Sequence, residues 1–152
     1  MTTITDVTEE YINAARSQVG ILAFEDGYEQ SFHADEIETA RWLHKTFGGN
    51  LTLLKESTRQ GVKTADYLWN GRLWERKGIS SSKFGTIDLR IRIALGQIME
   101  KRGGIVLDFS DSEMNMEKIM NHVARSLKER AHGKTDIIIK KRETYIVLRA
   151  KK

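Results

Sequence analysis

Two acidic residues and a lysine could build a site for phosphodiester hydrolysis. Asp66 is followed by Glu75, and Lys77 completes a Glu-x-Lys pattern. This reaction needs a metal ion to polarise the phosphate, an activated water, and stabilisation of the developing negative charge. Carboxylates are hard oxygen ligands that suit Mg²⁺ or Mn²⁺, and a lysine can approach the water or the phosphate. We therefore predict that Asp66 and Glu75 bind a divalent cation beside Lys77.

A β-hairpin is the element predicted to position these residues. Two short strand-like segments flank Asn70-Gly71, which is the strongest short signal for a type I′ hairpin turn. Side chains on a strand alternate between its two faces, so Glu75 and Lys77 are predicted to share one face. The same alternation sends Trp74 to the opposite face, where it would join the core.

The pattern also has a plainer interpretation, because alternating Glu and Lys residues are common on solvated strands. Its context favours chemistry. Residues 34–47 form an amphipathic pattern ended by Gly48-Gly49, as expected for a helix. Glu36 borders the apolar stripe of this helix and could enter the site as a further acid and metal ligand.

The remaining periodicities predict a mixed β-sheet flanked by helices. Helical spacing of apolar residues extends over 86–102, with Gly103-Gly104 as its predicted stop, and recurs from Met116 to Leu127. The apolar run 105–109 is typical of a buried strand. From the first amphipathic helix onward the order is α-β-β-β-α-β with an added helix and a terminal β-hairpin, an α/β (α+β) fold class.

Length and composition favour one compact domain. The chain has 152 residues, of which 39% are hydrophobic and 30% charged, an ordinary balance for a globular protein. Residues 1–31, a predicted helix and short strand, are interpreted as an N-terminal extension to a domain over 32–152. No apolar run is long enough to span a membrane. The chain has no cysteine, which excludes thiolate metal sites, and its net charge of +4 is compatible with a polyanionic partner.

Five short motifs occur in a fixed order along the chain: Glu36-Ile-Glu-Thr-Ala, Phe47-Gly-Gly, Lys63-Thr-Ala-Asp66-Tyr, Trp74-Glu75-x-Lys77-Gly, and Gln97-Ile ahead of Gly103-Gly104. The order of elements is similar to that of the PD-(D/E)xK nuclease superfamily. More closely, these motifs and roughly residues 32 to 150 resemble the tRNase domain family found at the C-terminus of CdiA, the toxin of contact-dependent growth inhibition. Ala65 departs from the family's frequent Pro at a position where many active members vary.

This resemblance implies a restriction-endonuclease-like core and a metal-dependent endonuclease of toxin type that favours RNA, specifically tRNA, over DNA. It implies that Asp66, Glu75 and Glu36 hold Mg²⁺ or Mn²⁺, with Zn²⁺ as a further option, and that Lys77 is the catalytic lysine. It also implies action in the bacterial cytoplasm after delivery by a toxin system, and a cognate immunity protein as a partner.

Three residues are predicted nucleic-acid contacts: Gln97, Arg90 and Lys63. Gln97 could equally be an ordinary polar helix residue, and Arg90 an exposed surface arginine. Among the four histidines, only His33 lies close enough to Glu36 in sequence to be a candidate for the site. Two alternatives to a nuclease stay open: a non-catalytic nucleic-acid-binding module that keeps the fold, and a protein-interaction domain.

Overall fold

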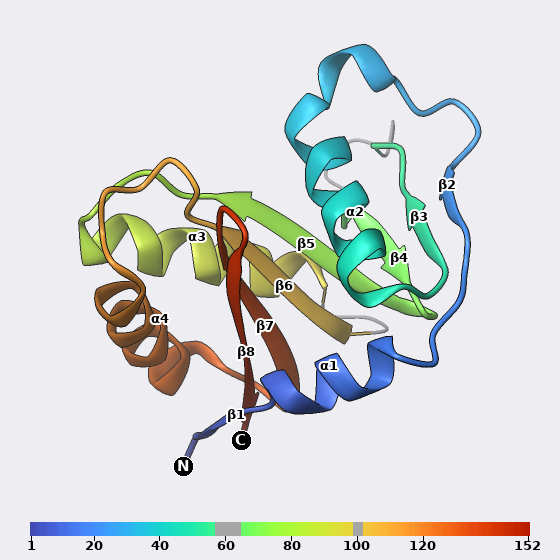
Figure 1. Ribbon diagram of the computed structural model, residues 1–152. Coiled ribbons are helices and arrows are strands. Elements are labelled where there is room, and N and C mark those ends of the chain that lie inside the picture. Colours follow the sequence, from blue (N-terminus) through green and yellow to red (C-terminus); the bar gives the residue numbers. More distant parts are fainter. Residues whose placement is uncertain (57–64, 99–101) are drawn as a thin grey trace.

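The protein is a mixed β-sheet with helices on both faces, which confirms the predicted mixed α+β class (Figure 1). The computed structural model describes residues 1–56, 65–98 and 102–152. In these ranges the elements are β1 Thr3–Asp6, α1 Thr8–Ala15, β2 Leu22–Phe24, the 3₁₀ turn η1 Gln30–Phe32, α2 Ala34–Phe47, β3 Leu51–Leu53, β4 Tyr67–Trp69, β5 Arg72–Gly78, α3 Phe84–Gln97, β6 Arg102–Asp108, α4 Met116–Arg130, β7 Lys134–Lys141 and β8 Thr144–Lys151.

The sheet combines parallel strands at its centre with antiparallel strands around them. Its order is β1-β8-β7-β6-β5-β4-β3-β2 in the described part of the chain. Strands β5, β6 and β7 run parallel, and α3 and α4 provide the connections between them. Strands β4 and β8 pair antiparallel to β5 and β7. Helices are needed for the parallel connections because a short turn cannot join parallel strands.

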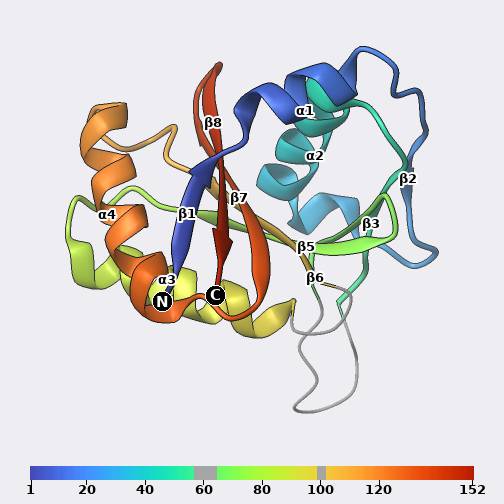
Figure 2. The same cartoon turned by 90° about the horizontal axis from the view of Figure 1, so that it is seen from below.

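Two apolar clusters lie on opposite faces of the sheet (Figure 2). The α3 and α4 face is covered by residues such as Ile91 and Val123, packed on alternate residues of β6 including Ile105. The α1 and α2 face holds Leu43 and an aromatic group that includes Trp74. Trp74 is 4% exposed, which confirms the prediction that it lies in the core on the face opposite Glu75.

Strand β4 fixes both ends of α2 through two aromatic side chains. The hydroxyl of Tyr67 donates to the carbonyl of Glu36 at 2.7 Å, in the first turn of the helix. The indole N–H of Trp69 donates to the carbonyl of Gly48 at 3.0 Å, at its last turn. These two residues share a face because strand side chains alternate. Helix α2 is thereby held in register with the hairpin, which positions Glu36.

The first 31 residues, predicted as an extension, supply both edge strands of the sheet. Strand β1 pairs antiparallel with β8, and β2 pairs parallel with β3. The predicted first helix starts only at Thr8, because Asp6 ends β1 and accepts from the N–H of Thr8 at 2.9 Å. Helix α4 begins after Asn115, whose side chain accepts from the backbone N–H of Lys118 at 2.9 Å.

The Asn70-Gly71 turn has the predicted conformation, with φ of 50° and 78° at its two central residues. Both values are positive, as a type I′ turn requires. The prediction that Gly103-Gly104 ends a helix was wrong. Both glycines belong to β6, and the described part of α3 ends at Gln97.

Gly104 is the glycine for which the structure leaves least room. A Cβ there would lie 2.1 Å from the carbonyl oxygen of Asp136 and 2.7 Å from the ring of Trp74. We expect Gly104→Ala to lower the free energy of unfolding by about 1–3 kcal/mol, because overpacking shifts backbone and core together. Chemical denaturation followed by tryptophan fluorescence measures this change.

Gly96→Ala is the matched control. A Cβ at this position meets nothing within 4 Å, and alanine is favoured over glycine in a helix by up to about 1 kcal/mol. The control should therefore be neutral or stabilising. Equal effects of the two substitutions would contradict the packing assigned to Gly104.

Candidate active site

Asp66 and Glu75 face each other where β4 and β5 stop pairing. The last paired residues at this end are Tyr67 and Trp74, so the next positions face each other without a strand bond. The carboxylate of Asp66 accepts from the backbone N–H of Arg76 at 2.8 Å, and Glu75 Oε1 accepts from the N–H of Asp66 at 3.1 Å. Each acid thus satisfies a backbone donor that the separating strands leave free.

Lys77 lies beside Glu75, as the alternation of the strand predicts. Its Nζ is 3.2 Å from Glu75 Oε2. The Glu75 side chain is 3% exposed and that of Lys77 is 18% exposed. A buried carboxylate needs such a partner, because an unpaired charge away from water is costly. The hairpin thus brings Asp66, Glu75 and Lys77 together, as the predicted metal-dependent chemistry requires.

Glu36 joins the two hairpin acids from α2. Its carboxyl lies within hydrogen-bonding reach of Asp66, which in turn reaches Glu75. Tyr28 donates its hydroxyl to Glu36 Oε2 at 2.9 Å, and His33 Nδ1 lies 3.8 Å from Glu36 Oε1. The three acids therefore form a connected chain, and His33 lies against its outer member.

Burial and mutual repulsion raise the pKa values of two of these acids toward neutral pH. Burial, followed by interaction with Asp66, raises the pKa of Glu36 to about 7. Burial, followed by the negative charge of Glu75, raises the pKa of Asp66 to about 7. Ionising all of these closely spaced carboxylates costs free energy unless a positive charge binds beside them. A divalent cation or the proton is the natural counter-charge.

The donor set fits a hard divalent cation in chemistry, although its oxygens are not arranged as a finished cage. In the part of the chain that the structure describes, no group of three or more histidine, aspartate or glutamate residues is placed to hold a metal ion. The acids follow one another as a chain instead of surrounding one point. Mg²⁺ commonly uses one or two carboxylates together with waters and substrate phosphates, and Asp66 with Glu75 can meet that requirement.

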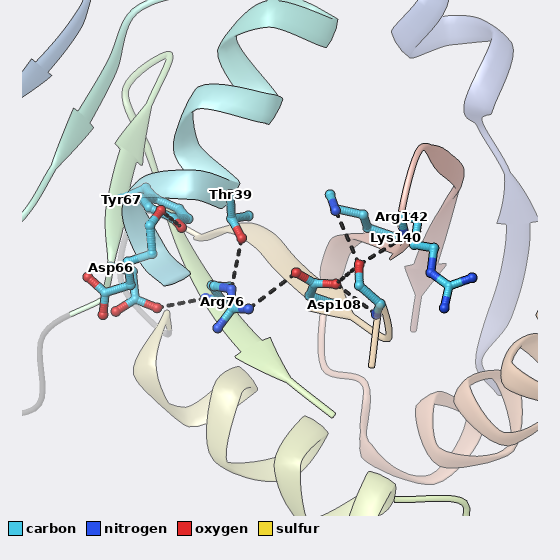
Figure 3. Close-up of polar contacts among 9 residues, drawn as sticks. Thr39, Asp66, Tyr67, Arg76, Asp108, Lys140 and Arg142 are labelled. Atoms are coloured by element: carbon cyan, nitrogen blue, oxygen red, sulfur yellow. Dashed lines mark hydrogen bonds and ion pairs between the residues drawn. The ribbon is translucent and has the colours of Figure 1, made fainter. Parts of the chain in front are cut away.

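Arg76, the residue that follows Glu75 on β5, is a further neighbour of the site. Its guanidinium donates to Thr39 Oγ1 at 2.9 Å and to Asp108 Oδ2 at 3.2 Å (Figure 3). Its backbone N–H binds Asp66. Arg76 therefore ties α2, β5 and β6 together at the residue next to Glu75, and the hydrogen bond to Asp66 orients that acid.

The alternation of β5 could have revealed this role. Arg76 falls on the same face as Trp74, toward α2, where a charged side chain needs a partner. Asp108 ends the apolar strand β6. Ser110 donates to Asp108 Oδ1 and binds Lys140, which extends the polar network across the sheet (Figure 3).

The predicted nucleic-acid contacts have different surroundings. Arg90 is exposed on α3. Gln97 is the last residue of that helix, and its Oε1 is buried with no hydrogen-bond partner in the described structure. Lys63 lies outside the described residues. A contact between any of the three and a nucleic acid stays a prediction.

Comparison with known proteins places this chain beside one toxin family. The family model of the contact-dependent growth inhibition CdiA C-terminal domain matches residues 63–146, a span that contains the hairpin acids and lysine. A chain in the solved CdiA-CT/CdiI toxin and immunity complex from Burkholderia pseudomallei has a TM-score of 0.55 and 15% identity, covering 82% of this chain and 97% of that chain. This likeness shows a shared fold. Among curated proteins, none matches the sequence.

Proposed function

Because the chain belongs to the contact-dependent growth inhibition CdiA C-terminal domain family, we propose that it is a metal-dependent endonuclease of toxin type with a PD-(D/E)xK core. The observation that carries the proposal is the buried carboxylate of Glu75, paired with the half-buried Lys77 and lying beside Asp66. The runner-up, a non-catalytic nucleic-acid-binding or protein-interaction module with the same fold, gives no role to acids held in this way.

The residues of the site have separable roles in this proposal. Asp66 and Glu75 are the metal ligands, and Glu36 is a third acid that reaches the ion or exchanges a proton with Asp66. A bound Mg²⁺ or Mn²⁺, or Zn²⁺, supplies Lewis-acid polarisation of the phosphate. Lys77 supplies a fixed positive charge where negative charge develops on the phosphate oxygens.

The substrate and partners of the proposal follow from the resemblance. RNA, and tRNA in particular, is favoured over DNA, and the place of action is the bacterial cytoplasm after delivery from another cell. The fold is shared with a chain of a toxin and immunity complex, which supports a cognate immunity protein for this chain as well. In the described residues, no helix is long and apolar enough to cross a membrane.

Cleavage in the presence of different metals tests the proposed function. Purified protein is incubated with total tRNA and with plasmid DNA in Mg²⁺, Mn²⁺, Zn²⁺ or EDTA. We expect fragments of tRNA with at least one metal, weaker or no cutting of DNA, and no cleavage in EDTA, because Asp66 and Glu75 need a cation to engage the phosphate.

The same assay distinguishes the alternatives. Binding that is weakened by salt, without cleavage under every metal, would replace the nuclease by a nucleic-acid-binding module. Absence of any salt-dependent binding would favour a protein-interaction domain. Preferential cutting of plasmid DNA would keep the nuclease and reject the RNA preference.

A further inference from the structure

A cavity lies apart from the acidic site, between α1 and the turn end of the central strands. It has a volume of about 360 Å³, within the range of small-ligand pockets. In Figure 1, α1 passes the lower ends of β6 and β7 near the turn between β4 and β5. Arg72 and Trp74 line the cavity from β5, on the face opposite Glu75 because strand side chains alternate. The cavity is therefore a separate place for a ligand.

The walls of this cavity carry an excess of positive charge. Arg72, Arg102, Lys134 and Arg149 are its four cations, and Glu10 and Asp136 are its two carboxylates, a net charge of +2. Both carboxylates are engaged by Arg149, which binds Asp136 at 2.7 Å and Glu10 at 2.9 Å. In the described part of the chain, the other three cations form no salt bridge. Their charge is available to an anion.

Arg102 is fixed in place without being neutralised. Its guanidinium donates to the carbonyl of His132 and to Thr135 Oγ1, and both acceptors are uncharged. The guanidinium of Arg72 in turn donates from Nη1 to the backbone carbonyl of Arg102 at 3.5 Å. Arginine binds phosphate well because its donors form a planar fork. A guanidinium that is held in place by uncharged acceptors is already oriented and keeps its positive charge for such a contact.

Aromatic side chains and amides line the same cavity. Trp69 and Trp74, each 4% exposed, pack with ring centroids 5.0 Å apart and present only a small part of their rings to the cavity, and the half-buried Tyr11 contributes a third ring to the lining. The side-chain amides of Gln18 and Asn70 also line the cavity and bond to each other, with Asn70 Nδ2 donating to Gln18 Oε1 at 2.9 Å. Aromatic surfaces bind nucleobases, and amides can pair with base edges. Together with the three cations that form no salt bridge in the described residues, this lining fits a ligand made of a flat ring joined to a phosphate.

We propose that the cavity between α1 and the β4–β5 turn binds a nucleoside monophosphate unit, with its phosphate toward Arg102 and Lys134 and its base toward Trp69 and Trp74. The unit is either a free nucleotide or one residue of a nucleic-acid strand. Binding requires neither the metal nor the acids of the hairpin. It can therefore be measured in EDTA, where its success or failure is independent of the proposed nuclease activity.

Fluorescence titration of the full chain in EDTA tests the proposal. The probes are the four ribonucleoside 5′-monophosphates, inorganic phosphate, adenosine, and a short single-stranded RNA. We expect saturable quenching of tryptophan fluorescence by at least one nucleotide, with binding at least tenfold tighter than that of phosphate or adenosine alone, and weakening as salt rises. Binding of phosphate as tight as that of every nucleotide, or no saturable change with any probe, would overturn the proposal.

Charge-removing variants locate the site. Arg102→Gln and Lys134→Gln should each weaken nucleotide binding about tenfold, because a charge-assisted contact to phosphate contributes on the order of 1.4 kcal/mol or more. Lys118→Gln, which removes an exposed charge from α4 on the other face, should leave it unchanged. Since Arg102 also has structural contacts, thermal melts check each fold, and Lys134, which is exposed, gives an independent variant.

Two comparisons complete the design. Unchanged affinity in both Arg102→Gln and Lys134→Gln would reject this cavity as the site. Competition between mononucleotide and RNA, with RNA the tighter ligand, would identify a strand as the natural source of the bound unit. Tighter binding of the mononucleotide would identify a free nucleotide.

Discussion

Glu75→Gln is expected to lower nuclease activity by at least about 10²-fold, the scale of losing one group that stabilises a transition state. The substitution keeps the length of the side chain and an acceptor for the N–H of Asp66, now 3.1 Å from Glu75 Oε1. It removes the negative charge that would bind the cation. It also places an amide beside the ammonium of Lys77, where a carboxylate oxygen lies at 3.2 Å. Initial rates of tRNA cleavage, measured across metal concentrations, give the size of the loss.

Lys77→Met tests the other half of the pair. It removes the positive charge and leaves Glu75 buried without its partner, so both activity and stability should fall. The two effects are separated by assaying well below the melting temperature and by adding metal, which should partly restore stability but not activity.

The control for Glu75→Gln is Glu38→Gln, which removes one acidic charge from an exposed position on α2. Cleavage by Glu75→Gln at the rate of the unaltered protein would reject the site.

The metal-free protein is expected to lose stability as pH rises from about 4 to about 7. The pKa of Asp66 rises on folding from 3.8 to about 7, because burial and the charge of Glu75 oppose ionisation. In this pH window the folded state binds more protons than the unfolded state, so the free energy of unfolding falls with increasing pH. A shift of about three units corresponds to roughly 4 kcal/mol, an upper limit for acids that share protons with one another.

Asp66→Asn should remove most of this pH dependence. The amide keeps an oxygen that can accept from Arg76 N, as Asp66 Oδ2 does at 2.8 Å, but it carries no charge to repel Glu75. We expect the variant to be more stable than the unaltered protein at pH 8, by about 2 kcal/mol, and nearly equal to it at pH 4. Urea denaturation in EDTA at a series of pH values measures both differences.

Metal ions should reverse the loss of stability that rising pH causes in the metal-free protein. Mg²⁺ or Mn²⁺ binds the ionised acids, so it should stabilise the unaltered protein at pH 8 and have little effect at pH 4. Asp66→Asn should respond much less to metal at either pH. If the unaltered protein is equally stable at pH 4.5 and pH 8 in EDTA, the repulsion assigned to Asp66 and Glu75 is absent. Asp66→Asn would thus gain stability and lose activity, a trade-off that is common where a site is built from groups that repel each other.

The sequence alone determined the local features of the candidate site. The Asn70-Gly71 turn adopts positive φ at both residues, because only such residues meet the type I′ requirement cheaply. Strand alternation placed Glu75 with Lys77 and turned Trp74 into the core, and both placements appear in the structure. These features depend on neighbours within a few residues, and the period of a strand makes them predictable.

Contacts between distant segments were decided only by the tertiary structure. No local signal shows that Gly103-Gly104 is part of β6, because the need for glycine comes from Trp74 and from the carbonyl of Asp136 on β7. The arrangement of Arg76 with Thr39 and Asp108 likewise joins three elements far apart in sequence. Strand β1 has its partner at the other end of the chain. Side-chain type and period give the face on which a residue lies, whereas its partner depends on how the strands are ordered in the sheet.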